Sequence, residues 1–336
     1  MKYMIPTLNK SVLLACAALL AGCNLAPRYE QPAPATPAWI GADGAEAVQA
    51  SSAGLQLASS LQWLKSPQLR EVVALALTHN RDLRVAVENI EKARAQYGIS
   101  RADLLPTVNA QAQANRARTA ADLNASGRST LTTQYTAQLG FASYEADLWG
   151  RIRNLNEAAL QQFLQSQDMR RNVQLGLVAD VATAWLNLAA DQARLQLAED
   201  TLQARLKSYE LTRRMKELGS TSGLVLAQNQ TTVDTARGDV ASYTSQLQRD
   251  RNALQLLVGG PVPAALLPDA RTLDLDSTPR QGTVAALLPV PAPLPSAVLL
   301  QRPDVQAAER NLRAMNANIG AARAAMFPTI SLTASV

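Results

Sequence analysis

Side chains that could carry out chemistry are few in this sequence. It has one histidine, His79, and two cysteines, Cys16 and Cys23, so a Cys/His metal site, an iron–sulfur cluster and a disulfide framework are excluded. Two carboxylates, Glu145 and Asp147, lie close enough in sequence for paired acid–base work, but no activated base accompanies them. We therefore predict no catalytic residue, no metal and no cofactor, and we do not expect an enzyme.

The thiol of Cys23 is the exception, because its context predicts a modification. Residues 1–22 carry two lysines and then an apolar run too short to span a bilayer, as in a secretory signal peptide. Leu20-Ala21-Gly22 precedes Cys23, which resembles the bacterial lipobox, in which the cysteine thiol is acylated. An ordinary signal peptide with a chance cysteine is the alternative reading. Several acyl chains on one residue would give a lasting membrane anchor.

The residue after Cys23 indicates to which membrane the protein would be sorted. Asn24 stands there, and the resemblance to lipoproteins implies sorting to the outer membrane, because Asp is the usual inner-membrane retention residue. Residues 23–60 are then predicted to be the lipid anchor and an extended Pro/Ala-rich linker with no pattern that could build a core.

Composition excludes several other classes. The chain of 336 residues has a net charge of +5, 18% charged and 47% hydrophobic residues, so it is neither disordered nor a bundle of transmembrane helices. Basic residues are scattered without interleaved aromatics, so we expect no nucleic-acid partner. Aromatics make up only 4%, which favours close helix contacts through small side chains.

Two segments, 106–116 and 131–142, alternate between polar and apolar residues. In the first, the polar set is Thr107, Asn109, Gln111, Gln113 and Asn115, against Val108, Ala110, Ala112 and Ala114. In the second, the mainly apolar set is Leu131, Thr133, Tyr135, Ala137, Leu139 and Phe141, against Thr132, Gln134, Thr136 and Gln138. Period two over this length is typical of strands that cross a bilayer with one face on a polar lumen. A soluble half-buried hairpin is the alternative.

Helical patterns of unusual length flank these segments. We predict helices over 69–104, 148–218 and 224–258, and the longest would reach roughly 100 Å at 1.5 Å per residue. A turn at 219–223 separates the last two. The returning helix carries apolar residues seven apart, as in a coiled coil: Leu226, Val233, Val240, Leu247 and Leu254. An ordinary pair of core helices is the alternative, but globular cores rarely accommodate such a length.

The chain also contains an internal repeat. Residues 82–112 align with 304–334 at a constant offset of 222, and both copies predict a helix that ends just before Pro-Thr and an alternating stretch. Chance similarity of Ala-rich helices is the alternative. We therefore expect a first repeat over 61–258, a connector over 259–294, and the start of a second repeat over 295–336. That second copy, with a helix over 303–325 and a strand from 328, is expected to be incomplete.

Barrel closure then predicts the assembly. Duplication gives four strands per chain, which is too few because the smallest barrels have eight. A dimer would supply eight strands and a trimer twelve, and the polar lumen faces favour the trimer. The predicted fold class is an α+β membrane protein, in which shared β-barrel strands continue into a long α-helical coiled coil.

Several motifs carry a resemblance to a known family. The most specific is the segment Ser143-Tyr-Glu-Ala-Asp-Leu-Trp-Gly-Arg151 at the step from strand to long helix. Others are Leu20-Ala-Gly-Cys23, Pro27-Arg-Tyr-Glu-Gln-Pro32, Trp63, Asn80-Arg-Asp-Leu83, Thr201-Leu-Gln-Ala-Arg205 and Asn252-Ala-Leu-Gln-Leu-Leu-Val-Gly-Gly-Pro261. Along its whole length the chain is similar to the outer-membrane factors, the lipoprotein exit ducts of tripartite efflux pumps.

The resemblance implies a homotrimeric, twelve-stranded outer-membrane barrel continued by a periplasmic helical tunnel. A periplasmic adaptor and an inner-membrane RND-type pump would dock on it, and drugs or other toxic solutes would leave passively. Tyr144 and Trp149 would then lie near the membrane interface as amphipathic anchors. The alternative is that these two aromatics only pack the junction between barrel and helices.

Residues 214–224 resemble the hairpin tip that meets the adaptor, which assigns Arg214, Gly219, Ser222 and Leu224 to that contact. Val225 and Asn229 stand where relatives often carry Asp and Ala, so no tip salt bridge is carried over. The acidic constriction of the family would belong to the second repeat, so no gating residue is predicted. The rival functions are a periplasmic adaptor lipoprotein, which would flank its hairpin with compact β-domains, and an enzyme of the cell envelope.

Overall fold

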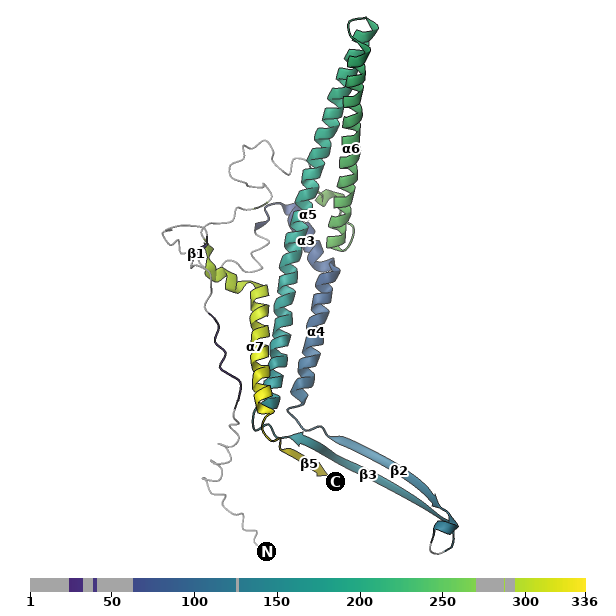
Figure 1. Ribbon diagram of the computed structural model, residues 1–336, viewed down its shortest axis with the longest axis vertical. Helices are drawn as coiled ribbons and strands as arrows, with labels where there is room; N and C mark the ends of the chain where they lie inside the picture. The colour runs from purple at the N-terminus through teal and green to yellow at the C-terminus, as the bar shows by residue number, and fades with distance from the viewer. Residues whose placement is uncertain (1–23, 33–38, 41–62, 125–126, 270–286, 288–293) are drawn as a thin grey trace. The chain divides into compact units, whose positions relative to one another are not determined.

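A computed structural model describes residues 24–32, 39–40, 63–124, 127–269, 287 and 294–336 (Figure 1). The predicted lipid-attachment residue Cys23 and most of the predicted linker lie outside these residues. The chain divides into two compact units, one of residues 1–33, 89–167 and 306–336, the other of residues 34–88 and 168–305. Each unit is described by itself below.

A long antiparallel hairpin dominates the second unit (Figure 1). Helix α5 runs unbroken over Arg151–Glu217, 67 residues, of which residues 168–217 belong to this unit, and α6 runs over Gly223–Val258. Between them Gly219 has a φ of 71°, which a residue without Cβ adopts at no steric cost. The predicted heptad seam of the returning helix is confirmed, since Val233 and Leu254 are fully buried and the other three members half-buried. The two predicted helices differ from the observed ones by at most three residues at any end.

The core of this unit lies around one side chain, Trp185 of α5. Helix α3, Pro67–His79, buries Leu69, Val72 and Val73 against it. The indole Nε1 of Trp185 donates a hydrogen bond to the carbonyl of Leu266, 3.0 Å away. Leu266 belongs to a short 3₁₀ turn, η4 at Ala264–Leu266, so part of the predicted 259–294 connector contributes to the core. Sequence periodicity could not indicate this, because one 3₁₀ turn has no repeat to detect.

The predicted helix 69–104 is wrong in one respect, because it is two helices, α3 and α4 (Arg81–Ala102). The break is at Asn80, whose backbone is extended (φ −61°, ψ 132°). Its amide Nδ2 donates to the carbonyl of Leu257 at 2.8 Å, and its Oδ1 accepts from the backbone N–H of Leu83 at 2.8 Å. Asn80 therefore caps α4 and the end of α6 together, and this long-range contact decides the break.

Gly259 shows how closely the two helix ends meet at this break. It ends α6 with a φ of 85°, and a Cβ there would lie 2.5 Å from the carbonyl oxygen of His79. Elsewhere in this unit β1, Trp39–Ile40, pairs with β4, Leu294–Pro295, which is followed by the 3₁₀ helix η5, Ser296–Gln301.

The first unit contains an antiparallel sheet in the order β2-β3-β5 (Figure 1). Its strands are β2 at Asn109–Thr119, β3 at Thr130–Glu145 and β5 at Ser331–Ser335, with the 3₁₀ turn η3, Ala121–Leu123, after β2. Cross-strand partners share a face, and over residues 110–115 the register pairs polar with polar and apolar with apolar: Gln111 with Gln138, Gln113 with Thr136, Ala112 with Ala137, and Ala114 with Tyr135. The predicted two-faced strands are confirmed, although β2 begins three residues late.

Helix α7, Pro303–Ala324, packs in this unit on α5 through small side chains. Ala158, Ala314 and Ala317 form a buried cluster, as the scarcity of aromatics led us to expect. The bounds of α4 and α7, and the starts of β2 and β5, all differ by 222 residues. The two copies therefore have the same local structure, although the duplication of the whole protein stays a prediction.

Candidate functional site

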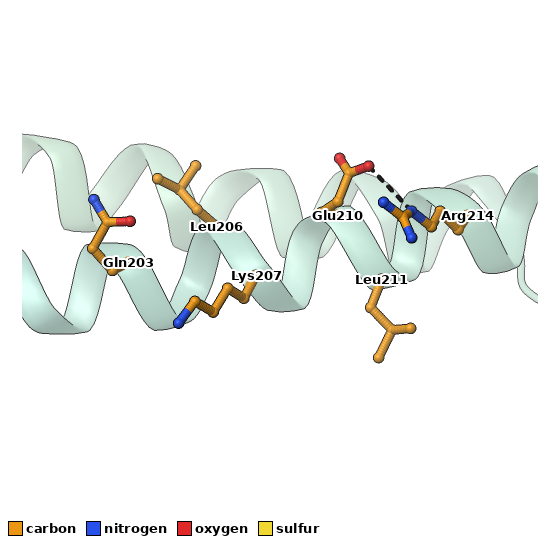
Figure 2. A pocket seen from close by; sticks show the side chains of 6 residues that line it. All are labelled: Gln203, Leu206, Lys207, Glu210, Leu211 and Arg214. Carbon is orange, nitrogen blue, oxygen red and sulfur yellow. Dashed lines mark hydrogen bonds and ion pairs between the residues drawn. The ribbon is translucent and has the colours of Figure 1, made fainter.

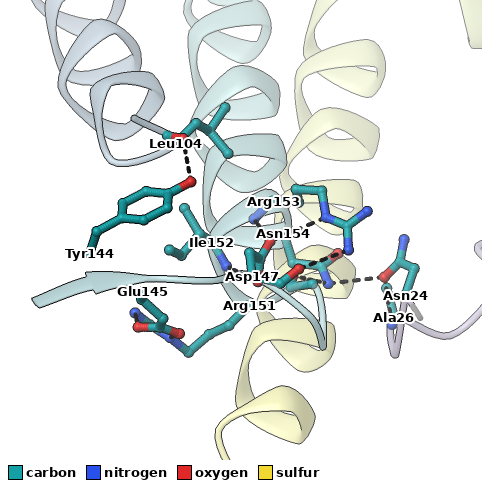
Figure 3. A network of polar contacts seen from close by, with 11 residues as sticks. Asn24, Ala26, Leu104, Tyr144, Glu145, Asp147, Arg151, Ile152, Arg153 and Asn154 are labelled. Atoms are coloured by element: carbon teal, nitrogen blue, oxygen red, sulfur yellow. Dashed lines mark hydrogen bonds and ion pairs between the residues drawn. The ribbon is translucent and has the colours of Figure 1, made fainter. Parts of the chain in front are cut away.

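A network of polar contacts lies at the step from strand β3 to the long helix α5, in the first unit (Figure 3). Asp147 caps the start of α5, because its carboxylate accepts from the backbone N–H groups of Ile152 at 3.1 Å and Arg153 at 2.9 Å. These are N–H groups that a helix cannot satisfy itself, and the negative charge also suits the positive end of the helix dipole. Asp147 therefore fixes the residue at which α5 begins.

A second carboxylate ties the strand end to the helix. Glu145 accepts from Nε and Nη2 of Arg151 at 2.8 and 2.5 Å, a bidentate pair. The hydrogen bonding to Glu145 is the largest influence on Arg151 and raises the pKa of its guanidinium, so Arg151 stays positively charged. Both carboxylates singled out by sequence thus have structural contacts. In the part of the chain described, no cluster of three or more metal-ligating side chains exists.

The two predicted interface aromatics, Tyr144 and Trp149, donate hydrogen bonds to backbone carbonyls of the other two connections between a helix and a strand, which are α4 to β2 and α7 to β5. The hydroxyl of Tyr144 donates to the carbonyl of Leu104, just after α4, at 3.2 Å. The indole of Trp149 donates to the carbonyl of Pro328, after α7, at 3.1 Å, and stacks on Phe327 with ring centroids 4.7 Å apart. These contacts join all three connections between helix and strand, and both partners of each contact belong to the chain itself, so they can form whichever solvent surrounds the junction.

A β-bulge aims Tyr144 at this junction. Between Phe141 and Tyr144 strand β3 holds one residue more than its partner β5, and Ser143 has a φ of 59°. The partners of Phe141 and Tyr144 are Ala334 and Leu332, two residues apart, so the two aromatic rings share one face of the sheet. Sequence reasoning missed this bulge, because it assumed strict alternation through residue 142.

Residues 24–32, predicted to be linker, form what we call the strap along α5 and α7. Nδ2 of Asn154 donates to Oδ1 of Asn24 at 2.9 Å, and Nδ2 of Asn316 donates to the carbonyl of Pro27 at 2.8 Å. The guanidinium of Arg313 lies 5.4 Å from the ring centre of Tyr29. Part of the predicted extended linker, residues 24–32, therefore packs along the helices.

Gly320 permits the closest approach of the strap to α7. A Cβ at this position would lie 2.7 to 2.9 Å from three atoms of Ala26, two of them backbone. Its repeat counterpart, Gly98 on α4, has nothing within 4 Å of the same position. The glycine is therefore structurally required in one copy of the repeat and not in the other.

The predicted hairpin tip is exposed and held by local contacts. Ser222 caps α6 by accepting from the N–H of Val225 at 3.3 Å, and Leu224 beside it is 68% exposed. Arg214 pairs with Glu210 at 3.4 Å. Figure 2 shows the side chains that line a groove along the last turns of α5: Gln203, Leu206, Lys207, Glu210, Leu211 and Arg214.

Comparison with known families identifies the chain. The family model described as outer membrane efflux protein matches residues 72–260 and 294–336, which include α5, α6, α7 and the whole sheet. The chain belongs to this family. The predicted resemblance is thereby confirmed. Among the described residues one helix, α5, is long and apolar enough to cross a membrane by length and composition.

Individual members of the outer membrane efflux protein family are similar over nearly the whole chain. The probable efflux pump outer membrane protein TtgC of Pseudomonas putida is 43% identical over 324 residues, 96% of this chain. Outer membrane protein OprJ of Pseudomonas aeruginosa is 40% identical over 98% of this chain. This chain spans only 65% of the length of TtgC and 66% of that of OprJ.

Solved structures agree with the fold. A membrane protein from Pseudomonas aeruginosa superposes with a TM-score of 0.76 at 38% identity, covering 94% of this chain and 68% of that one. The open state of the MtrE outer membrane channel of Neisseria gonorrhoeae gives a TM-score of 0.76 at 34% identity, covering 94% and 66%. The strand-and-long-helix architecture is thus that of known outer-membrane channels.

The strap can be tested with a matched pair of glycines. We expect Gly320→Ala to displace the strap from α7, so that trypsin cleaves after Arg28 about 5 to 30 times faster, which corresponds to a loss of about 1–2 kcal/mol. Gly98→Ala makes the same chemical change on a helix face with open space and should leave the cleavage rate unchanged. Equal rates in both variants would show that the strap does not depend on this contact.

Proposed function

We propose that this protein forms the outer-membrane exit duct of a tripartite efflux pump, through which drugs or other toxic solutes leave passively. One observation carries the proposal. A sheet with one polar and one apolar face, both uncovered in the single chain, leads through a capped junction into a 67-residue helix. The names of the relatives, efflux pump outer membrane proteins, support the same function.

The apolar face requires lipid and the polar face requires a lumen. Every residue of β2 is exposed, including Ala110, Ala112 and Ala114 on one side and Gln111 and Gln113 on the other. Neither β2 nor β5 has a second partner among the described strands, so the sheet has two open edges. Open edges are not tolerated in lipid, which supports closure with strands of other chains, and a homotrimer with twelve strands is the assembly we propose.

Two independent features would place the membrane surface at the same level. Tyr144 and Trp149 lie at the junction, and each has an apolar ring and a bonded polar end, as interfacial anchors do. Oδ1 of Asn24 accepts a hydrogen bond from Asn154. The side-chain Nδ2 and the backbone N–H of Asn154 also donate to the carbonyl of Gly150 at the junction. Since Cys23 is joined covalently to Asn24, acyl chains on its thiol would enter the membrane beside these aromatics.

At the other end of α5 the tip would receive the periplasmic adaptor. Leu218 and Leu224 are 82% and 68% exposed, next to a surface in which Arg213 and Arg214 both pair with Glu210. An apolar point within a charged surface suits another helical hairpin. An RND-type pump in the inner membrane would then supply the solute. Membership of the outer membrane efflux protein family favours this duct over the rival adaptor function.

The two faces of β2 offer a direct test of the barrel. We expect the Ala112→Arg variant to be largely absent from the outer-membrane fraction. An arginine on the lipid face destabilises a membrane-inserted barrel by about 2–4 kcal/mol near the bilayer centre. Gln113→Arg, one residue away on the opposite face, should insert normally and change only transport. Fractionation followed by immunoblotting measures both. Loss of both variants alike, or of neither, would contradict a lipid face and a lumen face.

The lipid anchor has its own test. Labelled palmitate should be incorporated into the wild-type protein and not into Cys23→Ser, because only a thiol forms the thioether. Incorporation that survives the substitution would refute this site while leaving the barrel unaffected.

The tip can be tested without disturbing the barrel. We expect Leu224→Ser to weaken binding of the cognate adaptor by about 10- to 150-fold, because the leucine side chain would lose roughly 1.5–3 kcal/mol of burial at that contact. Leu256→Ser, an exposed leucine at the far end of the same helix, is the matched control. Adaptor binding measured on immobilised protein should separate the two, and identical affinities would argue against docking at the tip.

A further inference from the structure

Two carboxyl groups meet inside the contact between α5 and α6. Asp191 is on α5, less than one turn beyond the buried Leu188, and Asp250 is on α6, one turn before the buried Leu254. Asp191 is only 6% exposed, and Oδ2 of Asp250 is shielded from solvent. Neither residue was singled out by the sequence, and neither is part of the junction or the tip.

The surrounding donors do not satisfy both groups. Nε2 of Gln246 donates to Oδ1 of Asp250 at 2.9 Å, and Nη1 of Arg194 donates to Oδ1 of Asp191. Oδ2 of Asp250 has no donor within the described protein, yet the two carboxyl groups lie within hydrogen-bond reach of each other. Two ionised carboxylates have only acceptors, so a bond between them needs one proton.

We propose that Asp191 and Asp250 share a single proton and that this proton makes the α5–α6 contact sensitive to pH. With the proton on Asp250, its hydroxyl donates to the Asp191 carboxylate and bridges the two helices. Without it, two negative charges face each other in a partly buried contact and repel. The inference depends only on this contact and stands independently of the proposed export function.

The charges that act on the pair agree with this assignment. The hydrogen bond to Asp191 raises the pKa of Asp250, and burial adds to the effect, whereas Gln246 and Arg249 oppose it. The pKa of Asp191 is lowered, first by the hydrogen bond from Asp250 and then by Arg194, against the effect of burial. The facing charged groups are therefore Asp191 and Arg194 on α5, and Asp250 and Arg249 on α6.

The sign of the pH dependence follows from these directions. A raised pKa in the folded state means that the folded protein holds this proton more tightly than the unfolded chain does. The stability that protonated Asp250 contributes to the α5–α6 contact therefore declines as pH rises above the ordinary aspartate range. The lowered pKa of Asp191 acts oppositely, and its contribution is lost as pH falls below that range. The contact is tightest between the two limits, where Asp191 is ionised and Asp250 is protonated.

Infrared difference spectra of the full protein test the shared proton. We expect a protonated-carboxyl C=O band that disappears only above the ordinary aspartate range, and its loss in Asp250→Asn, whose amide still donates to Asp191 but cannot titrate. Asp239→Asn, an exposed aspartate on the same helix, should leave the band unchanged. In Asp191→Asn the band should persist but titrate at lower pH, since the hydrogen bond that raises the pKa of Asp250 is changed.

Amide hydrogen exchange tests the consequence for the helices. After correction for the intrinsic rate, exchange in the segments around residues 191 and 250 should rise at least threefold in the wild type as the proton is lost. In Asp250→Asn it should stay flat across the same pH range. The proposal is overturned if the band is absent, if it survives in Asp250→Asn, or if exchange in that variant follows the wild type.

Discussion

A backbone that enters lipid must have every N–H and C=O paired, and in the proposed barrel this constraint governs the first unit. The backbone N–H and C=O groups of its three strands pair where the strands adjoin, and two edges and two faces of the sheet stay uncovered. A single chain offers nothing among its described residues to cover them. Small apolar side chains and amide side chains alternate along the strands, so the two faces of the sheet need different surroundings. A closed barrel built from several chains meets both requirements at once, which is why the proposed assembly is oligomeric.

The junction solves the problem that this constraint creates at the end of the strands. Where a ladder of inter-strand hydrogen bonds gives way to a helix, the first N–H groups of α5 have no partner in either element. Asp147 accepts two of those donors, Glu145 holds Arg151, and Tyr144 and Trp149 bond the carbonyls of the neighbouring connections. Two acidic residues that could suggest catalysis by their spacing are thus explained by the change from strand to helix.

Interactions within one element were readable from the sequence, and contacts between distant segments were not. The glutamine and alanine faces of β2, the heptad seam of α6 and the Gly219 turn were all predicted, because each follows from a local period or a single dihedral angle. The break at Asn80 was missed because it depends on a carbonyl 177 residues away, at Leu257. The strap was missed because a proline-rich extended segment has no period to detect.

The sequence by itself determined the two-faced strands, the lengths of α5 and α6, the turn between these two helices and the membership of the outer membrane efflux protein family. These depend on side-chain periodicity, on glycine and proline positions, and on motifs that span a few residues. Only the tertiary structure decided that Asn24 binds beside the junction, that Gly320 must lack a side chain while Gly98 need not, and that Asp191 meets Asp250. Those outcomes depend on which surfaces come within a few ångströms of each other, and no local pattern encodes that distance.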